Sequence, residues 1–217
     1  MSEQPNSEPD WKSLVKAFVS RARDTIADAE KHLKIPVGTL EAASDNDYLA
    51  IMKSATTIEP LLHDALESEI KRLRKLKVEH EGAAVLATYV RKNGRFRDKA
   101  KLAFDMGLIN EPRFKFVCHL QEIRNHYAHH ISNLNLSILD IIEKSEMNVD
   151  ATYAALGLFR FAPDDTREEN NSRLRTAIYF SLAQFLADAL VVINPPIVPG
   201  LLGVMSKHFE KQDDQKS

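Results

Sequence analysis

Three features are scarce in this sequence, and each scarcity excludes a class of protein. Among 217 residues there is a single cysteine, Cys118, so no disulfide can form within the chain and a reducing compartment fits it. Only seven glycines occur, and no alternation of apolar and polar residues predicts a strand. Because residues 1–10 are polar and unlike a signal peptide, we expect an all-α protein of the cytoplasm.

An excess of charge of one sign is also missing. The net charge is -2 although 28% of the residues are charged, which gives no support to a protein that binds polyanions over its whole surface. One long apolar run, Thr176 to Ile193, raises the question of a membrane span. Gln184 and Asp188 interrupt this run, so we interpret it as a core helix of a soluble protein and expect no contact with a membrane.

What the sequence has in abundance is helical periodicity, which first predicts two long helices. One begins after the capping-box sequence at residues 7–10 and ends at Pro36. The other opens at residues 45–47 and carries an apolar stripe. Pro60 lies inside this second helix and lacks a backbone N–H, so we expect a kink or a break near Glu59.

The same periodicity predicts four more helices. A short helix over residues 96–104 should end with Gly107 as its C-terminal cap. The next should start at residues 110–112. A shorter helix over residues 136–144 and a long final one over residues 173–193 follow. The helix that starts at residues 110–112 should bury a stripe of Phe116, Leu120, Ile123 and Tyr127.

These elements read as one unit. No internal repeat and no long linker divides the chain, so we predict a single helical domain over residues 1–210. Residues 151–161 are apolar but do not indicate one type of element. Residues 211–217 form a polar tail that we expect to be disordered.

The most informative stretch is residues 122–130, in which an arginine is followed by an amide and three histidines. Arg124 supplies a planar cation suited to bidentate binding of phosphate, and histidine exchanges protons near neutral pH. Together they suit phosphodiester chemistry. The same residues also suit a structural role, because an arginine beside a core stripe can bind a carboxylate and histidines stabilise a helix C-terminus.

The spacing of the motif leaves its geometry open. On a helix, Asn125 and His129 share a face, whereas Arg124 and His129 do not. Those two converge only if the helix frays after Ala128 or if two copies of the motif meet across a dimer. His130 returns toward the side of Arg124 and is the rival for the role of His129.

The histidines do not predict a metal centre. His126, His129 and His130 lack an acidic or cysteine partner at ligand spacing, and Glu122 with His126 would supply only two ligands. We therefore expect no metal site and no cofactor.

A basic stretch lies between Lys71 and Lys101, where only three acidic residues oppose it. Beside an Arg/His motif, such a stretch suits an RNA backbone, although it also suits a solvated helix face paired with acidic neighbours. The candidate RNA-binding residues are Lys71, Arg72, Arg74, Lys75, Arg91, Lys92, Arg95 and Arg97. No helix-turn-helix spacing, zinc-finger or P-loop pattern is present, so we expect no sequence-specific binding of DNA.

Two resemblances bear on these residues. The segment from Arg124 to His129 resembles the R-x4-6-H signature of HEPN domains, including the polar residue after the arginine. The sequence GRFRDKAKLAFDMGLI at residues 94–109, leading through residues 120–123 into the motif, resembles the mannitol operon repressor family. The resemblance covers about residues 55–131.

The resemblance implies a HEPN-like bundle of antiparallel helices, with long N-terminal and C-terminal helices. It implies a regulator of transcription that lacks an obvious DNA-reading motif and acts by binding a partner. The alternative it implies is a metal-independent endoribonuclease, a toxin or defence effector, whose paired motifs meet at a dimer interface. In that enzyme the catalytic residues would be Arg124, Asn125 and His129. We expect a homodimer, with RNA or a regulatory protein as its partner.

Overall fold

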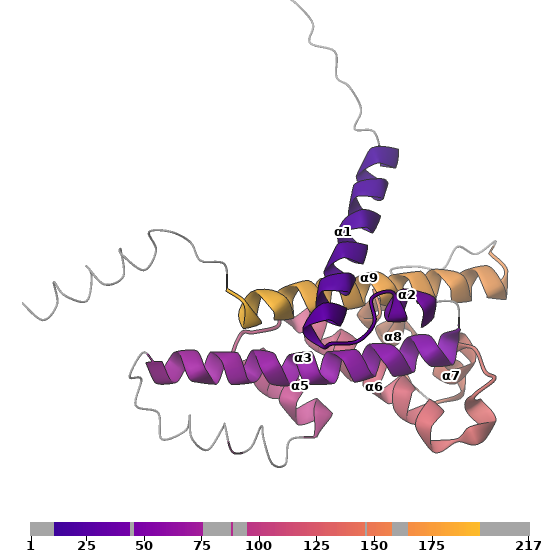
Figure 1. Ribbon diagram of the computed structural model, residues 1–217. Helices are drawn as coiled ribbons and strands as arrows, with labels where there is room; N and C mark the ends of the chain where they lie inside the picture. Colours follow the sequence, from indigo (N-terminus) through magenta and orange to yellow (C-terminus); the bar gives the residue numbers. More distant parts are fainter. Residues whose placement is uncertain are drawn as a thin grey trace, which may run out of the picture.

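The computed structural model describes residues 11–43, 46–75, 88, 95–145, 147–157 and 165–195, and all regular elements within these ranges are helical (Figure 1). The prediction of an all-α protein is confirmed. The helices are α1 (Trp11–His32), α2 (Thr39–Ala43), α3 (Asp47–Lys75), α5 (Phe96–Asp105), α6 (Glu111–His129), the 3-10 turn η1 (Ile131–Asn133), α7 (Ile138–Lys144), α8 (Val149–Ala155) and α9 (Arg167–Ile193). The expected capping box at residues 7–10 and tail at residues 211–217 lie outside the described residues.

Local capping sets the ends of the helices near the motif. Gly107, at φ +71°, ends α5 with its N–H bonded to the Phe104 carbonyl at 2.9 Å, as the sequence predicts. Asn110 then begins α6, since its side chain accepts a hydrogen bond from the Arg113 N–H at 3.1 Å. The predicted stripe of α6 is confirmed, and Phe116, Leu120, Ile123 and Tyr127 are each 0–1% exposed.

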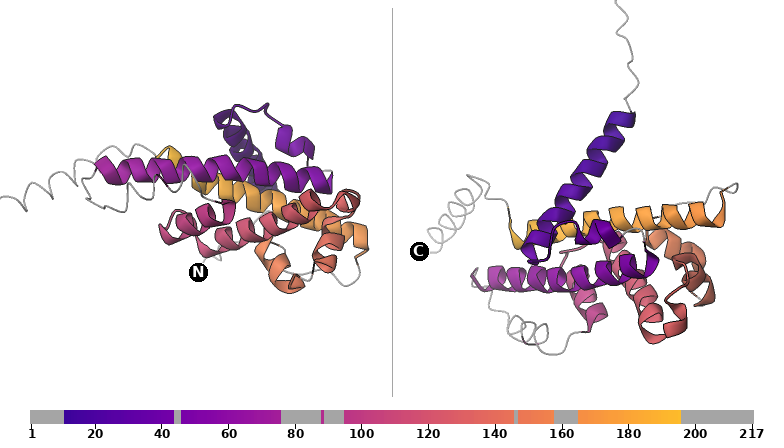
Figure 2. Two further views of the ribbon diagram at one scale, coloured as in Figure 1. Left: turned by 90° about the horizontal axis from the view of Figure 1, so that it is seen from below. Right: turned by 45° about the vertical axis from the view of Figure 1, so that its right-hand side comes forward.

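Helix α3 continues through Pro60 and is straight along its length in Figures 1 and 2, so the prediction of a kink or a break near Glu59 is wrong. A proline removes only one intrahelical hydrogen bond, that of the Thr56 carbonyl. The helix keeps its course because the residues on both sides of the proline are fully packed. Ile58, Leu61 and Leu62 are 0–1% exposed, and burying such side chains stabilises the fold by about 1.5–3 kcal/mol each.

The centre of the fold is the pair α3 and α9, which run parallel to each other (Figures 1 and 2). Their first turns meet where Asp47 bonds Asn171 and Arg175, and their last turns meet where Ser68 donates to the Val192 carbonyl at 3.4 Å. The expectation of an antiparallel bundle is therefore wrong for this pair. Parallel packing is possible because the connection from α3 to α9, which includes five shorter elements among the described residues, returns the chain to the same end.

Helix α6 runs antiparallel to both of these helices. Near its start, Arg113 pairs with Asp188 at 3.1 Å, close to the end of α9. Near its end, the Tyr127 ring meets Tyr48 in the first turn of α3, with ring centroids 5.7 Å apart. Helices α5, α7 and α8 pack against α6, so its C-terminal motif lies at one end of the bundle.

Helix α1 crosses α9 and packs on it (Figure 1). Its second half is buried in the core, with Ala22, Ile26 and Ala29 at 0–6% exposure. Its first half projects from the body. After α1 the chain turns back into α2. The fully buried side chain of Glu30, in the last turns of α1, accepts a hydrogen bond from the Leu40 N–H and so caps α2.

Helix α9 passes a test of length and composition for crossing a membrane. That test is weak evidence, because core helices of soluble proteins pass it too. In this fold α9 contacts α1, α3 and α6, and Ile178, Leu182, Phe185 and Leu186 are each 0–1% exposed. Its place in the bundle therefore accounts for the buried face, which is 33% of the apolar window.

Candidate functional site

The Arg/His motif lies on the last two turns of α6. The helix runs unbroken to His129, and His130 is its C-terminal cap in an extended conformation, at φ -134° and ψ 103°. The helix therefore does not fray after Ala128, which was one of the two arrangements that would bring Arg124 and His129 together. Arg124, Asn125 and His129 all keep helical positions, and their directions follow from helical geometry.

Arg124 is half-buried and held by its neighbour on the helix. Its Nη1 donates to the Asn125 Oδ1 at 3.3 Å, and the Gln121 Nε2 donates to the same oxygen at 3.1 Å. Among the described residues, no carboxylate lies within ion-pair distance of Arg124. The guanidinium is thus oriented by an amide while most of its hydrogen-bond donors and its full charge remain unpaired.

His129 does not join Arg124 within one chain. The two residues are five positions apart on a regular helix, which separates their directions by about 140°. His129 is exposed and lies on the side of Asn125, as expected from the spacing. A site that uses both side chains therefore requires a second copy of the motif.

His130, the rival histidine, does not turn toward Arg124. It lies with His126 at a cavity of about 220 Å³ that Arg124 does not line. The other lining residues are Ser132, Asn133, Ile141 and Lys144. Sequence reasoning did not identify this group, because Lys144 reaches the cavity only through the packing of α7. The turn at Asn133 was the one local signal that the chain folds back there.

The remaining polar groups of α6 are not activated for catalysis. The Tyr127 hydroxyl donates to the Leu136 carbonyl at 2.9 Å, and burial raises the pKa of Tyr127 far above its ordinary value. The His119 Nδ1 lies 3.1 Å from the Thr152 Oγ1, and burial lowers the pKa of His119. Burial likewise raises the pKa of the Cys118 thiol, so the unreactive protonated form predominates.

The structure distributes the basic stretch over separate places and pairs much of it. On α3, Lys71 pairs with Glu67 at 3.4 Å and the Arg72 Nε donates to Glu69 at 2.7 Å. Arg97 at the start of α5 lies 3.7 Å from Glu122. These contacts match the alternative of a solvated face with acidic neighbours.

The other candidate RNA-binding residues are not brought into one patch by the described contacts. Arg74, Lys75 and Arg95 are exposed, and Arg91 and Lys92 lie outside the described residues. Lys99 of α5 pairs with Glu59, which precedes the basic end of α3 by about 18 Å along the helix. Helix α5 therefore lies beside the middle of α3 and not beside its basic end.

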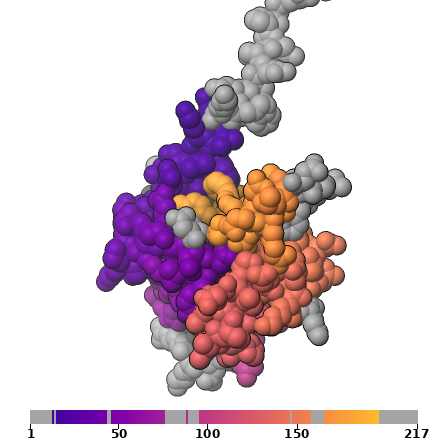
Figure 3. Space-filling view, turned by 90° about the vertical axis from the view of Figure 1, so that its right-hand side faces the viewer, coloured from indigo at the N-terminus to yellow at the C-terminus, as the bar shows by residue number. Residues whose placement is uncertain are grey.

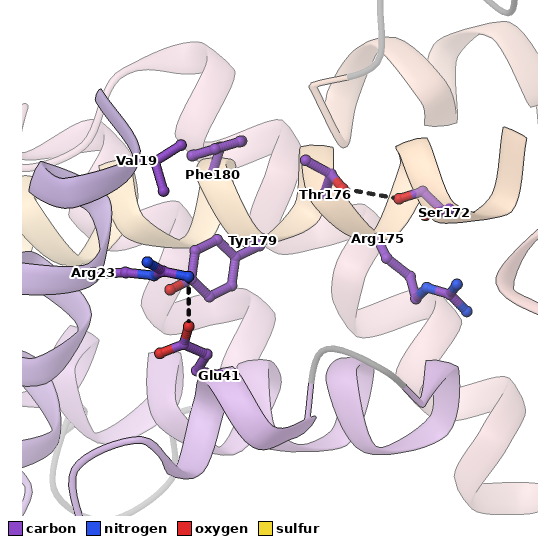
Figure 4. A pocket seen from close by; sticks show the side chains of 8 residues that line it. All are labelled: Val19, Arg23, Glu41, Ser172, Arg175, Thr176, Tyr179 and Phe180. Atoms are coloured by element: carbon purple, nitrogen blue, oxygen red, sulfur yellow. Dashed lines mark hydrogen bonds and ion pairs between the residues drawn. The ribbon is translucent and has the colours of Figure 1, made fainter. Parts of the chain in front are cut away.

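A second hollow, of about 230 Å³, lies between α1, α2 and α9 (Figure 4). Its two arginines are already neutralised, since Arg23 pairs with Glu41 at 3.0 Å and Arg175 pairs with Asp47 at 2.9 Å. Tyr179 and Phe180 form its apolar side. This hollow could therefore contact a ligand through its apolar side, but its arginines are already paired with carboxylates.

No group of three or more histidine, cysteine or acidic side chains in the described part of the chain is arranged to hold a metal ion. Comparison of the chain with protein-family models, with curated proteins and with solved structures finds no match in any of the three.

Proposed function

We propose that this protein is a cytoplasmic regulatory protein of the mannitol operon repressor type, with a HEPN-like helical bundle, that acts as a homodimer by binding a protein partner. The observation that carries the proposal is the row of exposed apolar side chains on α1, judged against the described part of the chain. Regulation is indirect in this proposal, because the sequence has no DNA-reading motif and any contact with DNA would be weak and sensitive to salt.

The apolar stripe of α1 continues beyond the body of the protein. Ala22 and Ile26, on its inner half, are 6% and 2% exposed, whereas Val15 and Phe18 on the projecting half are 59% and 47% exposed. The first turns of α1 stand clear of the other described helices in the ribbon and space-filling views, whereas Phe18 contacts Phe180 of α9 (Figures 1 and 3). A stripe that is buried along half its length and exposed along the rest is typical of a helix that lacks its partner.

A hollow beside α1 offers a place where this face could dock on a second copy. Phe18 packs on Phe180 with ring centroids 4.9 Å apart, and next to them a hollow of about 210 Å³ is floored by Ala183 and Ala187 of α9. Small side chains allow a helix to approach closely. In a symmetric dimer, the projecting half of each α1 would lie in the hollow of the other copy, which covers both apolar surfaces with one interface.

Changing Val15 to glutamate is expected to weaken this dimer at least about 100-fold. The change places a charge in the interface twice, once for each copy, and removes the burial of two valine side chains, each of which contributes about 1.5–3 kcal/mol. Sedimentation equilibrium of the wild type and of Val15→Glu over a range of concentrations measures the difference.

Val37→Glu is the matched control, because Val37 is 58% exposed on the connection between α1 and α2 and should leave the dimer intact. Circular dichroism should show the same helicity in all three proteins. A wild type that stays monomeric at tens of micromolar, a concentration at which ordinary dimers persist, would contradict the proposal.

A second candidate function rests on Arg124. Its half-buried guanidinium has an amide neighbour and no described carboxylate, which suits binding of a phosphate. In a ribonuclease, His129 of a second copy would take the proton from the ribose 2′-OH, whose oxygen attacks the phosphorus while the 5′-oxygen leaves. Arg124, with Asn125 beside it, would stabilise the charge on the pentavalent phosphate.

A cleavage assay in the presence of EDTA separates the two functions. We expect the wild type to leave single-stranded RNA and DNA of the same sequence intact. Arg124 and His129 do not converge in one chain, and the proposed dimer is formed through α1 and α9 and not through the motif on α6. Cleavage of RNA but not DNA, abolished by His129→Ala or Arg124→Ala, would establish the ribonuclease instead. His130→Ala tests the rival histidine. Lys115→Gln serves as the control, since Lys115 is exposed on α6 and paired with Glu111.

A further inference from the structure

The cavity at the end of α6 is not lined by Arg124, Asn125 or His129, and the rival histidine His130 is the one residue that it shares with the ribonuclease candidate. It lies where α6, η1 and α7 meet, and Ile141, which is 1% exposed, forms its apolar floor. Three of its six lining residues, His126, His130 and Lys144, are basic, and none is acidic. A cavity lined by basic side chains and no acidic ones favours the binding of an anion.

The basic groups of the cavity are not neutralised by described carboxylates. Lys144 bonds its Nζ to the neutral amide oxygen of Asn133 at 3.2 Å. The described histidines that lie near a carboxylate are His32, His63 and His119, none of which lines this cavity. The charge of Lys144 is therefore available to a ligand.

The nearest acidic residues on α7 are bound elsewhere. Asp140 accepts hydrogen bonds from the Ser137 hydroxyl, at 2.6 Å, and from Arg167. Glu143 accepts from the Arg167 Nη2 at 2.8 Å. Arg167 engages both carboxylates and offsets one of their two negative charges, and neither Asp140 nor Glu143 lines the cavity.

Asn133 organises the cavity from within. It is 3% exposed, and its Nδ2 donates to the His126 carbonyl at 3.0 Å while its Oδ1 holds Lys144. Its backbone N–H donates to the His130 carbonyl at 2.9 Å. Two backbone carbonyls at the C-terminal end of α6 thus have hydrogen-bond donors. The Lys144 side chain is held in place before a ligand binds.

We propose that this cavity binds a phosphate group, either inorganic phosphate or the phosphate ester of a small metabolite. Lys144 and the two imidazoles would pair with its oxygens, and the Ser132 hydroxyl at the rim would donate a further hydrogen bond. The volume of about 220 Å³ is below the roughly 300–1,000 Å³ of pockets that enclose drug-sized ligands, which favours a small anionic group. Arg124 lies about 160° around the helix from His126, so this site does not use the guanidinium of the ribonuclease candidate.

Isothermal titration calorimetry of the full chain with inorganic phosphate, with AMP and with adenosine tests the proposal. We expect phosphate or AMP to bind with a dissociation constant of about 0.1–1 mM, and adenosine not to bind. Binding of phosphate alone identifies free phosphate as the ligand, whereas tighter binding of AMP identifies a phosphate ester. Equal binding of AMP and adenosine overturns the proposal, as does the absence of binding by both anions.

Variants locate the site. Lys144→Gln and His126→Gln should each weaken the anion about tenfold or more, since each removes a charge-assisted hydrogen bond. Lys115→Gln, on the first half of α6, should bind as the wild type does. Loss of binding in Arg124→Gln with full binding in Lys144→Gln would move the anion to the arginine and refute this site. Circular dichroism of each variant verifies that the helices are retained.

Discussion

Replacing Asp47 by alanine is expected to lower the free energy of unfolding by about 3–5 kcal/mol, as for other buried ion pairs from which one partner is removed. Asp47 joins three helices, because its Oδ2 accepts from the Ile138 N–H at 2.9 Å and from the Asn171 Nδ2 at 2.7 Å, while its Oδ1 accepts from Arg175 at 2.9 Å. Alanine would leave all three donors without this acceptor, and two of them lie in the interior. Urea unfolding followed by circular dichroism measures the loss.

The comparison variants separate charge from packing. Asp47→Asn keeps the size of the side chain but turns an N–H₂ group toward donors, so it should be destabilising as well. Glu168→Gln removes the other carboxylate near Arg175. Because the Glu168 side chain is 79% exposed, this change should leave the free energy of unfolding unchanged within error. An Asp47→Ala protein that unfolds within about 1 kcal/mol of the wild type, the net value of one ordinary hydrogen bond, would show that the three contacts are not cooperative.

Replacing Glu30 by alanine is expected to cost about 2–4 kcal/mol, the loss of two charge-assisted hydrogen bonds in the interior. Glu30 is 0% exposed, and its two carboxylate oxygens accept from the Gly38 and Leu40 N–H groups at 2.7 Å each. Its negative charge therefore stands at the N-terminus of α2, where the N–H groups of the first turn stabilise it. Gly38, at φ +89°, lets the backbone turn toward this carboxylate.

The effect of Glu30→Ala should be seen in the backbone as well as in stability. Hydrogen exchange of the Gly38 and Leu40 amides should accelerate, because alanine offers them no acceptor. Asp28→Asn, on the same helix, is the control, since Asp28 and its partner Lys31 are each 65% exposed and such pairs contribute little. Unchanged exchange at both amides in Glu30→Ala would show that water replaces the carboxylate.

Some of these features follow from neighbours in the sequence. Asn110 and Gly107 act through backbone groups within a few residues, so the boundaries of α5 and α6 were predictable from local chemistry. The buried stripe of α6 was predictable for the same reason, because a helical period and apolar residue types determine which face seeks the core. The outcome at Pro60 was not, because the packing that outweighs the lost hydrogen bond comes from other helices.

The parallel order of α3 and α9 was also beyond local signals. It depends on contacts such as those of Asp47 with Asn171 and Arg175, more than 120 positions away in the chain. The sequence shows a carboxylate and an arginine in different helices but does not show that they meet. A bundle of helices of given lengths permits several orders of packing, and such specific contacts select one.

The motif on α6 shows the same division between local and tertiary information. By itself the sequence determined that Arg124 lies beside a buried stripe and that His129 lies on another side, because helical geometry depends only on spacing. Only the tertiary structure decided that Arg124 has no carboxylate among the described residues. It also decided that His130 joins Lys144 across the turn at Asn133. Charge pairing and cavities depend on where separate helices meet, and that arrangement is set by the packing of the whole core.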